Sequence, residues 1–254
     1  MTRSLRIAIA GCGDIARYVA FLLRLNRGVR VVACCDRDLP SAERFARQYR
    51  IPTAYADYRT MLDDQSLARE ALDAVYLAVP HDLHLDFARA AIERGVHVLV
   101  EKPVARTLAE GQELVRLAAR APVRVGVNYQ YRYDAGCYAL AHAGRTGALG
   151  RLYYGRCHVP WHRDAAYFDQ GSWRAQIARA GGGTLLTHGS HLLDILFWAF
   201  GARPVAATGV TARLKFARDS AVEVEDVAQA TVEVEGGALI QVCSAMVATP
   251  EQPV

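Results

Sequence analysis

A lysine near the middle of the chain stands where its chemistry could be used. The apolar run 98–100 leads into Glu101, Lys102 and Pro103, which predicts a short buried strand that ends where the chain turns. Of the 30 basic residues, only Lys102 and Lys215 are lysine. Burial can lower the pKa of a lysine into a useful range, whereas an arginine stays protonated. Lys102 is therefore a candidate catalytic residue, and the alternative is a lysine that stands at a strand end by chance.

A glycine-led helix carries the second group of polar side chains. Gly181–Gly183 precede a pattern that predicts a helix over 184–200, ended by Gly201. Its apolar residues recur at steps of three and four and form one buried face: Leu185, Leu186, Gly189, Leu192, Leu193, Leu196 and Phe200. The opposite stripe holds the polar residues and a tryptophan: Thr184, Thr187, His188, His191, Asp194 and Trp198. This stripe is a solvated face, a metal site with ligands three residues apart, or a catalytic surface.

The first strand and helix of the chain frame a glycine-rich turn. A strand predicted over 6–10 is followed by the motif Gly-Cys-Gly-Asp-Ile-Ala and then by helical periodicity, which is the arrangement of a dinucleotide-binding turn. Gly11 allows the tight turn, and Gly13 allows the close approach of a pyrophosphate. Asp14 and Ile15 begin the helix whose N-terminal N–H groups point at that anion. These four residues are predicted to bind a cofactor.

An acidic residue at the end of the second strand bears on the identity of the cofactor. The strand predicted over 29–35 ends at Asp36, the position expected to hold the ribose hydroxyls of a dinucleotide. Asp36 would repel a 2′-phosphate, so NAD is the favoured cofactor. Arg37 follows directly and could bind that phosphate, so NADP stays an alternative.

The order of the predicted elements indicates the fold. In the first half, strands alternate with helices, which predicts a Rossmann-type, doubly wound parallel sheet over residues 1–127. After 147–150 the strands become longer and partly alternating, which predicts an α+β domain over residues 128–254 with an open, mostly antiparallel sheet. The strands of this second domain are predicted over 152–158, 205–215, 222–234 and 238–244. The predicted fold class is α/β, with a dinucleotide-binding domain and a substrate-binding domain.

Composition argues against several classes of protein. The chain of 254 residues has a net charge of +4 without a basic run, so we expect no nucleic-acid partner. Its six cysteines are irregularly spaced, which predicts reduced thiols in a cytoplasmic protein rather than disulfides or a zinc ribbon. The apolar segment 7–10 is too short for a signal peptide, and no segment reaches the roughly 18 apolar residues that span a membrane. We therefore expect no membrane partner.

Four segments, GCGDIA, VYLAVPHDLH, GVHVLVEKPVART and VGVNYQYRYD, stand in an order and spacing that resembles the glucose–fructose oxidoreductase/inositol dehydrogenase (Gfo/Idh/MocA) family. The resemblance implies that Pro80 and His84 line the cofactor cleft. It also implies that Glu101 and Lys102 contribute to cofactor binding, with Lys102 beside both the nicotinamide and the substrate.

The glycine-led helix resembles the same family in its segment GGGTLLTHGSHLLD. The resemblance implies that His191 transfers a proton, facing Lys102 across a cleft between the domains, and that Asp194 orients it. Many family members carry Asp or Asn at the position of Thr187, and a hydroxyl can orient a substrate but cannot offset the charge of an imidazolium. His191 then acts without that partner, or His188 shares its role. Substrate contacts implied by the resemblance are the aromatic and polar groups Tyr129, Arg132, Tyr167, Trp173, Arg174, His188 and Asp194.

These observations predict an NAD(P)-dependent oxidoreductase. Hydride would pass between the nicotinamide and a carbinol or carbonyl carbon of a sugar, cyclic polyol or sugar derivative, while His191 takes the hydroxyl proton and Lys102 polarises the oxygen. The alternatives are a non-catalytic dinucleotide sensor, an NAD-assisted glycosidase, and a metal enzyme that uses the helix histidines. We expect no metal ion.

The resemblance ends with the segment 244–254, whereas relatives typically continue for several more strands. The substrate domain is therefore expected to be incomplete relative to the family and to leave an unpaired sheet edge. Because such edges recruit other chains, a homo-oligomer formed through the C-terminal sheet is expected.

Overall fold

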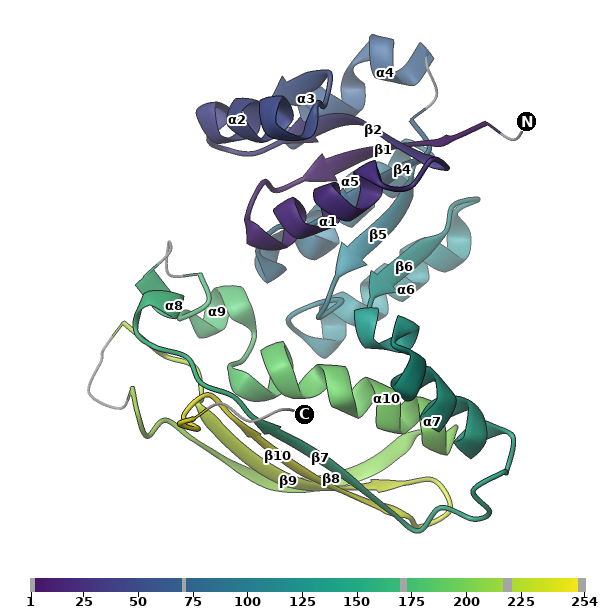
Figure 1. The fold of residues 1–254 in the computed structure, drawn as a ribbon, viewed down its shortest axis with the longest axis vertical. Helices are drawn as coiled ribbons and strands as arrows, with labels where there is room; N and C mark the ends of the chain where they lie inside the picture. Colours follow the sequence, from purple (N-terminus) through teal and green to yellow (C-terminus); the bar gives the residue numbers. More distant parts are fainter. Residues whose placement is uncertain (1–2, 70–71, 170–172, 217–220, 251–254) are drawn as a thin grey trace. The chain divides into compact units, whose positions relative to one another are not determined.

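The computed structural model describes residues 3–69, 72–169, 173–216 and 221–250. The chain divides into two compact units, Met1–Asn128 and Tyr129–Val254 (Figure 1). Each unit has its own sheet and its own hydrophobic core.

The described strands of the first unit form a six-stranded sheet in the order β3-β2-β1-β4-β5-β6, and every neighbouring pair is parallel. The strands are β1 Leu5–Ala10, β2 Val29–Cys35, β3 Thr53–Tyr55, β4 Ala74–Leu77, β5 His97–Glu101 and β6 Val125–Asn128. The helices between them are α1 Asp14–Arg24, α2 Leu39–Tyr49, α3 Tyr58–Asp63, α4 Gln65–Arg69, η1 His81–Leu83, α5 His84–Glu93 and α6 Leu108–Arg120. The predicted doubly wound sheet is confirmed, because the chain builds outwards from β1 in one direction and then in the other.

Helices cover both faces of this sheet (Figure 1). One core gathers Ala16 of α1 and Phe45 of α2 around Ile9 of β1. The other core lies under α3, α5 and α6 and includes Ala8 and Ala10 of the same strand. Successive residues of a strand thus enter opposite cores, which is why the strands of this half are continuously apolar rather than alternating.

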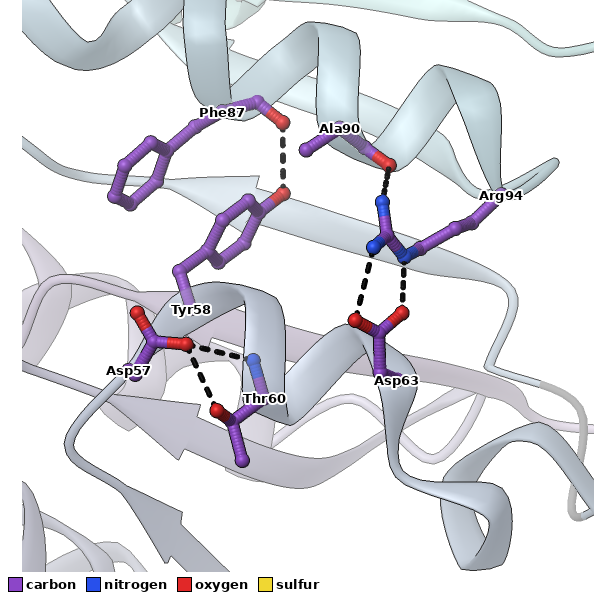
Figure 2. A network of polar contacts seen from close by, with 7 residues as sticks. All are labelled: Asp57, Tyr58, Thr60, Asp63, Phe87, Ala90 and Arg94. Atoms are coloured by element: carbon purple, nitrogen blue, oxygen red, sulfur yellow. Dashed lines mark hydrogen bonds and ion pairs between the residues drawn. The ribbon is translucent and has the colours of Figure 1, made fainter.

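A set of polar contacts holds the short helix α3 against α5 (Figure 2). The carboxylate of Asp57 caps the N-terminus of α3. The ring of Tyr58 stacks on that of Phe87 at 4.2 Å between centroids, and its hydroxyl donates to the Phe87 carbonyl at 3.0 Å. At the other end of α3, Asp63 accepts two hydrogen bonds from Arg94, at 2.6 and 3.0 Å. These contacts fix α3 at both ends.

The described strands of the second unit form a four-stranded sheet in the order β7-β10-β9-β8. The strands are β7 Tyr154–Pro160, β8 Pro204–Ala212, β9 Val227–Val234 and β10 Leu239–Ala245. Only the β7–β10 pair of this sheet is parallel, so the mostly antiparallel sheet is confirmed. The helical segments are η2 Gln130–Tyr133, α7 Ala135–Arg145, α8 Ala166–Asp169, α9 Ile177–Ala180, η3 Leu185–Gly189 and α10 Ser190–Phe200.

Helix α10 lies along one face of the second sheet, with α7 beside it (Figure 1). The predicted apolar helix face is confirmed for Leu185, Leu192, Leu193, Leu196 and Phe200, which pack on the buried side chains of the sheet. On the strands, exposed and buried residues alternate along β9 and β10, and β8 is exposed over almost its whole length. The outward side chains of the sheet are thus open in the described chain.

Two of the predicted strands are shorter in the structure. β8 ends at Ala212 and β9 begins at Val227, so the predicted strands 205–215 and 222–234 were too long. The carboxylate of Asp226, 1% exposed, accepts hydrogen bonds from three successive backbone N–H groups, those of residues 214 to 216. These bonds draw the chain around Asp226, whereas a continued strand would carry it away along the sheet.

The helix α7 was not predicted at all.

We expect Tyr58→Phe to lower the free energy of unfolding by about 1 kcal/mol, because the variant keeps the stacked ring and loses one buried hydrogen bond. Urea unfolding followed by circular dichroism measures this loss. The control is Tyr18→Phe, at a side chain that is 62% exposed, where a change within about 0.5 kcal/mol is expected. Equal effects of the two substitutions would contradict the role given to the Tyr58 hydroxyl.

Candidate active site

The glycine-rich turn between β1 and α1 leaves room for an anion. Gly11 has φ +88°, and a Cβ there would collide with the carbonyl of Ala78, just after β4. Gly13 stands at the N-cap of α1 without a side-chain capping bond, and no atom lies within 4 Å of the place its Cβ would take. Asp14 and Ile15 are exposed in the first turn. The helix start is thus accessible to a pyrophosphate, and the residues present fit a dinucleotide.

Asp36 follows β2 and closes the glycine turn from the side. Its Oδ2 accepts the N–H of Cys12 at 3.0 Å, and its Oδ1 accepts the N–H of Asp38 at 3.0 Å. Each carboxylate oxygen has further acceptor capacity, so these bonds leave room for ribose hydroxyls. Arg37 is exposed beside it.

His84 begins α5 and is fully buried, so its side chain does not form the surface of a cleft. Its Nδ1 lies 2.9 Å from the carbonyl of Pro103, and its Nε2 lies 3.1 Å from the carbonyl of Val79. The ring thereby joins the segment after β5 to the segment after β4, where Pro80 precedes η1. Burial lowers the pKa of His84 below its usual value. The structure supports a positioning role for His84.

Glu101 ends β5, and Lys102 follows it directly. The Glu101 side chain belongs to a hydrogen-bond network that the sequence did not reveal. The Glu101 side chain is 7% exposed. Its carboxylate accepts the hydroxyl of Tyr76 and the side-chain amide of Asn128, the latter at 2.6 Å. Burial, with the Glu101 charge second, raises the pKa of Tyr76, which keeps the phenol a donor. Tyr76 and Asn128 stand in segments quoted above, and a polar group within an apolar strand was the available signal for each.

A carboxylate caps the start of the helical segment that carries the two histidines. Glu225 accepts the N–H of Gly183 at 2.6 Å and that of Leu185 at 3.0 Å. A Cβ on Gly183 would collide with the Glu225 carbonyl, so this glycine is needed for the close approach. The first turn, η3, is a π-helix, a widened turn that often occurs at functional sites. Glu225 therefore fixes the start of the segment that leads to His191.

The residues at the start of the polar stripe are buried, which decides against one of its three interpretations. Thr184, Thr187, His188 and His191 are each at most 5% exposed. The hydroxyl of Thr187 donates to the Gly183 carbonyl at 2.6 Å and lies 3.3 Å from Nδ1 of His188. Aromatic rings pack against the two histidines: those of Tyr129 and Tyr131 lie beside His191, and that of Trp161 lies beside His188. A solvated helix face is excluded.

The two histidines have different neighbours. The ring of His191 lies 5.1 Å from that of Tyr131 and 6.0 Å from that of Tyr129, edge to face with the latter. His188 instead packs against Trp161 at 5.0 Å. Burial raises the pKa of both tyrosines, so they stay neutral donors beside His191. Tyr129 was predicted as a site residue; Tyr131 was not, although it lies in the same segment.

Asp194 pairs with Arg132. The guanidinium of Arg132 donates to the two carboxylate oxygens at 2.7 and 2.6 Å and lies 5.2 Å over the ring of Trp198. Such a bidentate pair is the strongest contact available to a carboxylate, and it joins η2 to α10. Two predicted substrate residues thus bind each other.

The remaining predicted substrate residues, Tyr167, Trp173 and Arg174, lie near His188. The Tyr167 ring is 6.0 Å from that of His188, and Arg174 lies over the rings of both Tyr167 and Trp173. All three side chains are half-buried.

His188, His191 and Asp194 do not form a metal site: within the described ranges, no three histidine, cysteine, aspartate or glutamate side chains are placed to hold a metal ion. All six cysteines are free. None of the helices in the described part of the chain is both long and apolar enough to cross a bilayer.

Comparison with known protein families shows to which family the chain belongs. The model of the oxidoreductase family with an NAD-binding Rossmann fold, Gfo/Idh/MocA, matches residues 5–129. The model of the Gfo/Idh/MocA C-terminal domain matches residues 137–254. The chain belongs to the Gfo/Idh/MocA family. Its first unit is therefore an NAD-binding Rossmann domain.

Curated relatives within the Gfo/Idh/MocA family act on sugars, as their names state. D-apiose dehydrogenase of Paraburkholderia graminis is 31% identical over 232 residues, which cover 91% of this chain and 57% of that protein. 1,5-anhydro-D-fructose reductase of Ensifer adhaerens is 29% identical over 241 residues, which cover 93% of this chain and 68% of that protein. The chain thus spans only part of the length of these relatives.

A solved Gfo/Idh/MocA structure shares the fold. The WlbA dehydrogenase of Chromobacterium violaceum, crystallised with NADH and UDP-GlcNAcA, superposes with a TM-score of 0.87 at 28% identity, covering 99% of this chain and 70% of that one.

We expect His84 to make folding depend on pH. Because burial lowers its pKa in the folded state, the unfolded chain binds the proton more readily. The stabilisation from neutral His84 is complete above about pH 6.5 and is lost as the pH falls towards the lowered value.

The free energy of unfolding of the wild type and of His84→Gln, measured by urea titration at several pH values, tests this. The advantage of the wild type should shrink between about pH 7.5 and 5.5, whereas the difference between the wild type and Tyr58→Phe should stay level, because burial raises the pKa of Tyr58 far above this range. An advantage for the wild type that grows on acidification would contradict the argument.

Proposed function

We propose that the protein is an NAD(P)-dependent dehydrogenase or reductase that acts on a CH–OH or carbonyl group of a sugar, cyclic polyol or sugar derivative. The observation that carries the proposal is the carboxyl edge of the parallel sheet. The uncapped start of α1, Asp36 and Lys102 all follow the carboxyl ends of its strands, where open α/β sheets bind ligands. The sugar substrates named for the curated relatives support the substrate class.

NAD is the proposed cofactor. The turn at Gly11 and Gly13 and the start of α1 would hold the pyrophosphate, and Asp36 would hold the ribose hydroxyls. The Asp36 carboxylate opposes a 2′-phosphate, which favours NAD over NADP despite the neighbouring Arg37. Bound NAD supplies a nicotinamide carbon that accepts or returns a hydride.

His191 is proposed as the base that takes the proton from the substrate hydroxyl. A neutral imidazole suits this task near pH 7. The ammonium of Lys102 is proposed to stabilise the negative charge that develops on the same oxygen. Thr187, whose hydroxyl is bound to the Gly183 carbonyl, is proposed to orient the His188–His191 turn.

We also propose that copies of the chain associate through the sheet of the second unit. Its strand β8 is exposed over nearly its whole length, and an exposed edge strand is a template for pairing with another chain. The six free cysteines support a compartment that keeps thiols reduced, which the cytoplasm does.

Asp36→Asn should shift cofactor preference towards NADP. The variant keeps an oxygen acceptor for the Cys12 N–H and removes the charge that repels a 2′-phosphate. We expect the ratio of the NADPH and NADH dissociation constants to change by about tenfold, equivalent to ~1.4 kcal/mol. Fluorescence titration with both reduced cofactors measures it, and Asp38→Asn is the control. A wild type that prefers NADPH would overturn the assignment.

His191→Asn should lower kcat by about 10² to 10⁴ with little change in NADH affinity, because it removes general-base catalysis from a residue outside the Rossmann domain. His142→Asn on α7 is the control and should retain activity. Lys102→Arg should lower kcat as much as Lys102→Ala does, since the larger guanidinium keeps the charge but loses the compact donor. Activity is read from NAD(P)H absorbance with a panel of sugars and polyols. Near-normal turnover by Lys102→Arg would contradict a catalytic role for Lys102 and leave it as a positive charge at a strand end.

A further inference from the structure

Two arginines of the second unit lie over the ring of one tyrosine. The guanidinium carbon of Arg163 is 5.5 Å from the centroid of Tyr167, and that of Arg174 is 5.4 Å from it. The two charges are therefore no more than about 11 Å apart. Each guanidinium also lies over a tryptophan, Arg163 over Trp161 at 5.4 Å and Arg174 over Trp173 at 4.8 Å. We call these five residues the arginine–aromatic cluster; all five are half-buried.

The carboxylates of the segment 223–226 are bound by the backbone rather than by Arg174. Within the described residues, Arg174 forms no ion pair with a carboxylate. Glu223 accepts the N–H of Ile177, and Glu225 accepts two N–H groups at the start of η3. Asp226 accepts three more. These three carboxylates are thus engaged by the backbone, and no carboxylate in the described residues forms an ion pair with Arg174.

The cluster lies beside His188, three residues before the proposed base His191. The Tyr167 ring is 6.0 Å from that of His188, and the Trp161 ring is 5.0 Å from it. His188 precedes His191 by three residues on one helical segment, about 4.5 Å along its axis. His188, against which two rings of the cluster pack, thus lies about one helical turn from the proposed base.

The chemistry of the cluster selects an anion. A guanidinium presents a planar fork of donors that matches the two oxygens of a carboxylate or phosphate. Stacking on an aromatic ring holds that fork in place, so little freedom is lost when an anion binds. We propose that Arg174 and Arg163 bind a negatively charged group, carboxylate or phosphate, of the sugar substrate. This inference rests on the proposed function and narrows it from sugars in general to anionic sugars.

The test compares ligands that share one ring. Glucose, glucuronate, glucose 6-phosphate and UDP-glucose are titrated by calorimetry into the full chain with NAD present, and each is then assayed for NAD reduction. The variants are Arg174→Gln, which removes the charge, and Arg174→Lys, which keeps the charge without the planar fork. The control is Arg151→Gln, because Arg151 also lies over a ring of the second unit, that of Tyr153, but alone.

At least one anionic sugar should bind at least tenfold more tightly than glucose, and its affinity should fall as NaCl rises from about 50 to about 500 mM. Arg174→Gln should weaken that binding by about 10- to 100-fold and leave glucose unaffected. Arg174→Lys should lie between the two, and Arg151→Gln should match the wild type. Preference for glucuronate identifies a carboxylate, and preference for the phosphorylated sugars identifies a phosphate.

Two outcomes separate this proposal from the one before it. If glucose binds as well as every anionic sugar, or none of the anionic sugars binds, the arginine–aromatic cluster is not an anion site, and the dehydrogenase proposal is untouched. If an anionic sugar binds through Arg174 but no sugar is oxidised, the dehydrogenase proposal fails and the anion site stands. If Arg174→Gln does not fold, the salt dependence of the wild type and the Arg174→Lys affinity decide.

Discussion

The candidate site of the first unit depends on the buried carboxylate of Glu101. It accepts hydrogen bonds from Tyr76 of β4 and Asn128 of β6, so it ties together the carboxyl ends of three adjacent parallel strands. A buried charge is tolerated only where donors of this kind satisfy it, and each such bond to a charged group contributes about 1.5–3 kcal/mol. Lys102 follows Glu101 directly. The backbone from which the proposed catalytic ammonium extends is therefore held by side chains of both neighbouring strands.

The second unit uses two carboxylates in a different way. Glu225 and Asp226 are adjacent in sequence, and both accept backbone N–H groups. Glu225 sets the start of the helical segment that carries the two histidines, while Asp226 turns the chain between β8 and β9. The rings that pack against the two histidines are aromatic, and two guanidinium groups lie over one of these rings, that of Tyr167. That environment suits a sugar, whose apolar ring face packs on aromatic surfaces and whose polar groups need donors.

The features that the sequence predicted well are those set by neighbouring residues. The turn at Gly11 and Gly13 and the placement of Lys102 at a strand end each follow from patterns within about ten residues. The parallel sheet follows from the order in which such local patterns alternate. Gly11 is the clearest case, because its positive φ and its contact with the Ala78 carbonyl exclude any side chain. The apolar face of α10 was likewise readable, since its period fits the helix that packs on the sheet.

What only the tertiary structure decided is which distant groups meet. No local pattern shows that Arg132 binds the carboxylate of Asp194, 62 residues away. The same holds for Glu101, whose partners Tyr76 and Asn128 are 25 and 27 residues away. It also holds for His84, which bridges the carbonyl of Pro103, 19 residues away, and that of Val79. The burial of the two histidines depends on aromatic rings from other segments, those of Tyr129, Tyr131 and Trp161. The sequence determined which residues stand at strand ends and on the apolar helix face, because local spacing sets both. The fold decided which polar groups these residues bind, because a hydrogen bond forms only between a donor and an acceptor that the packing brings to within about 3 Å.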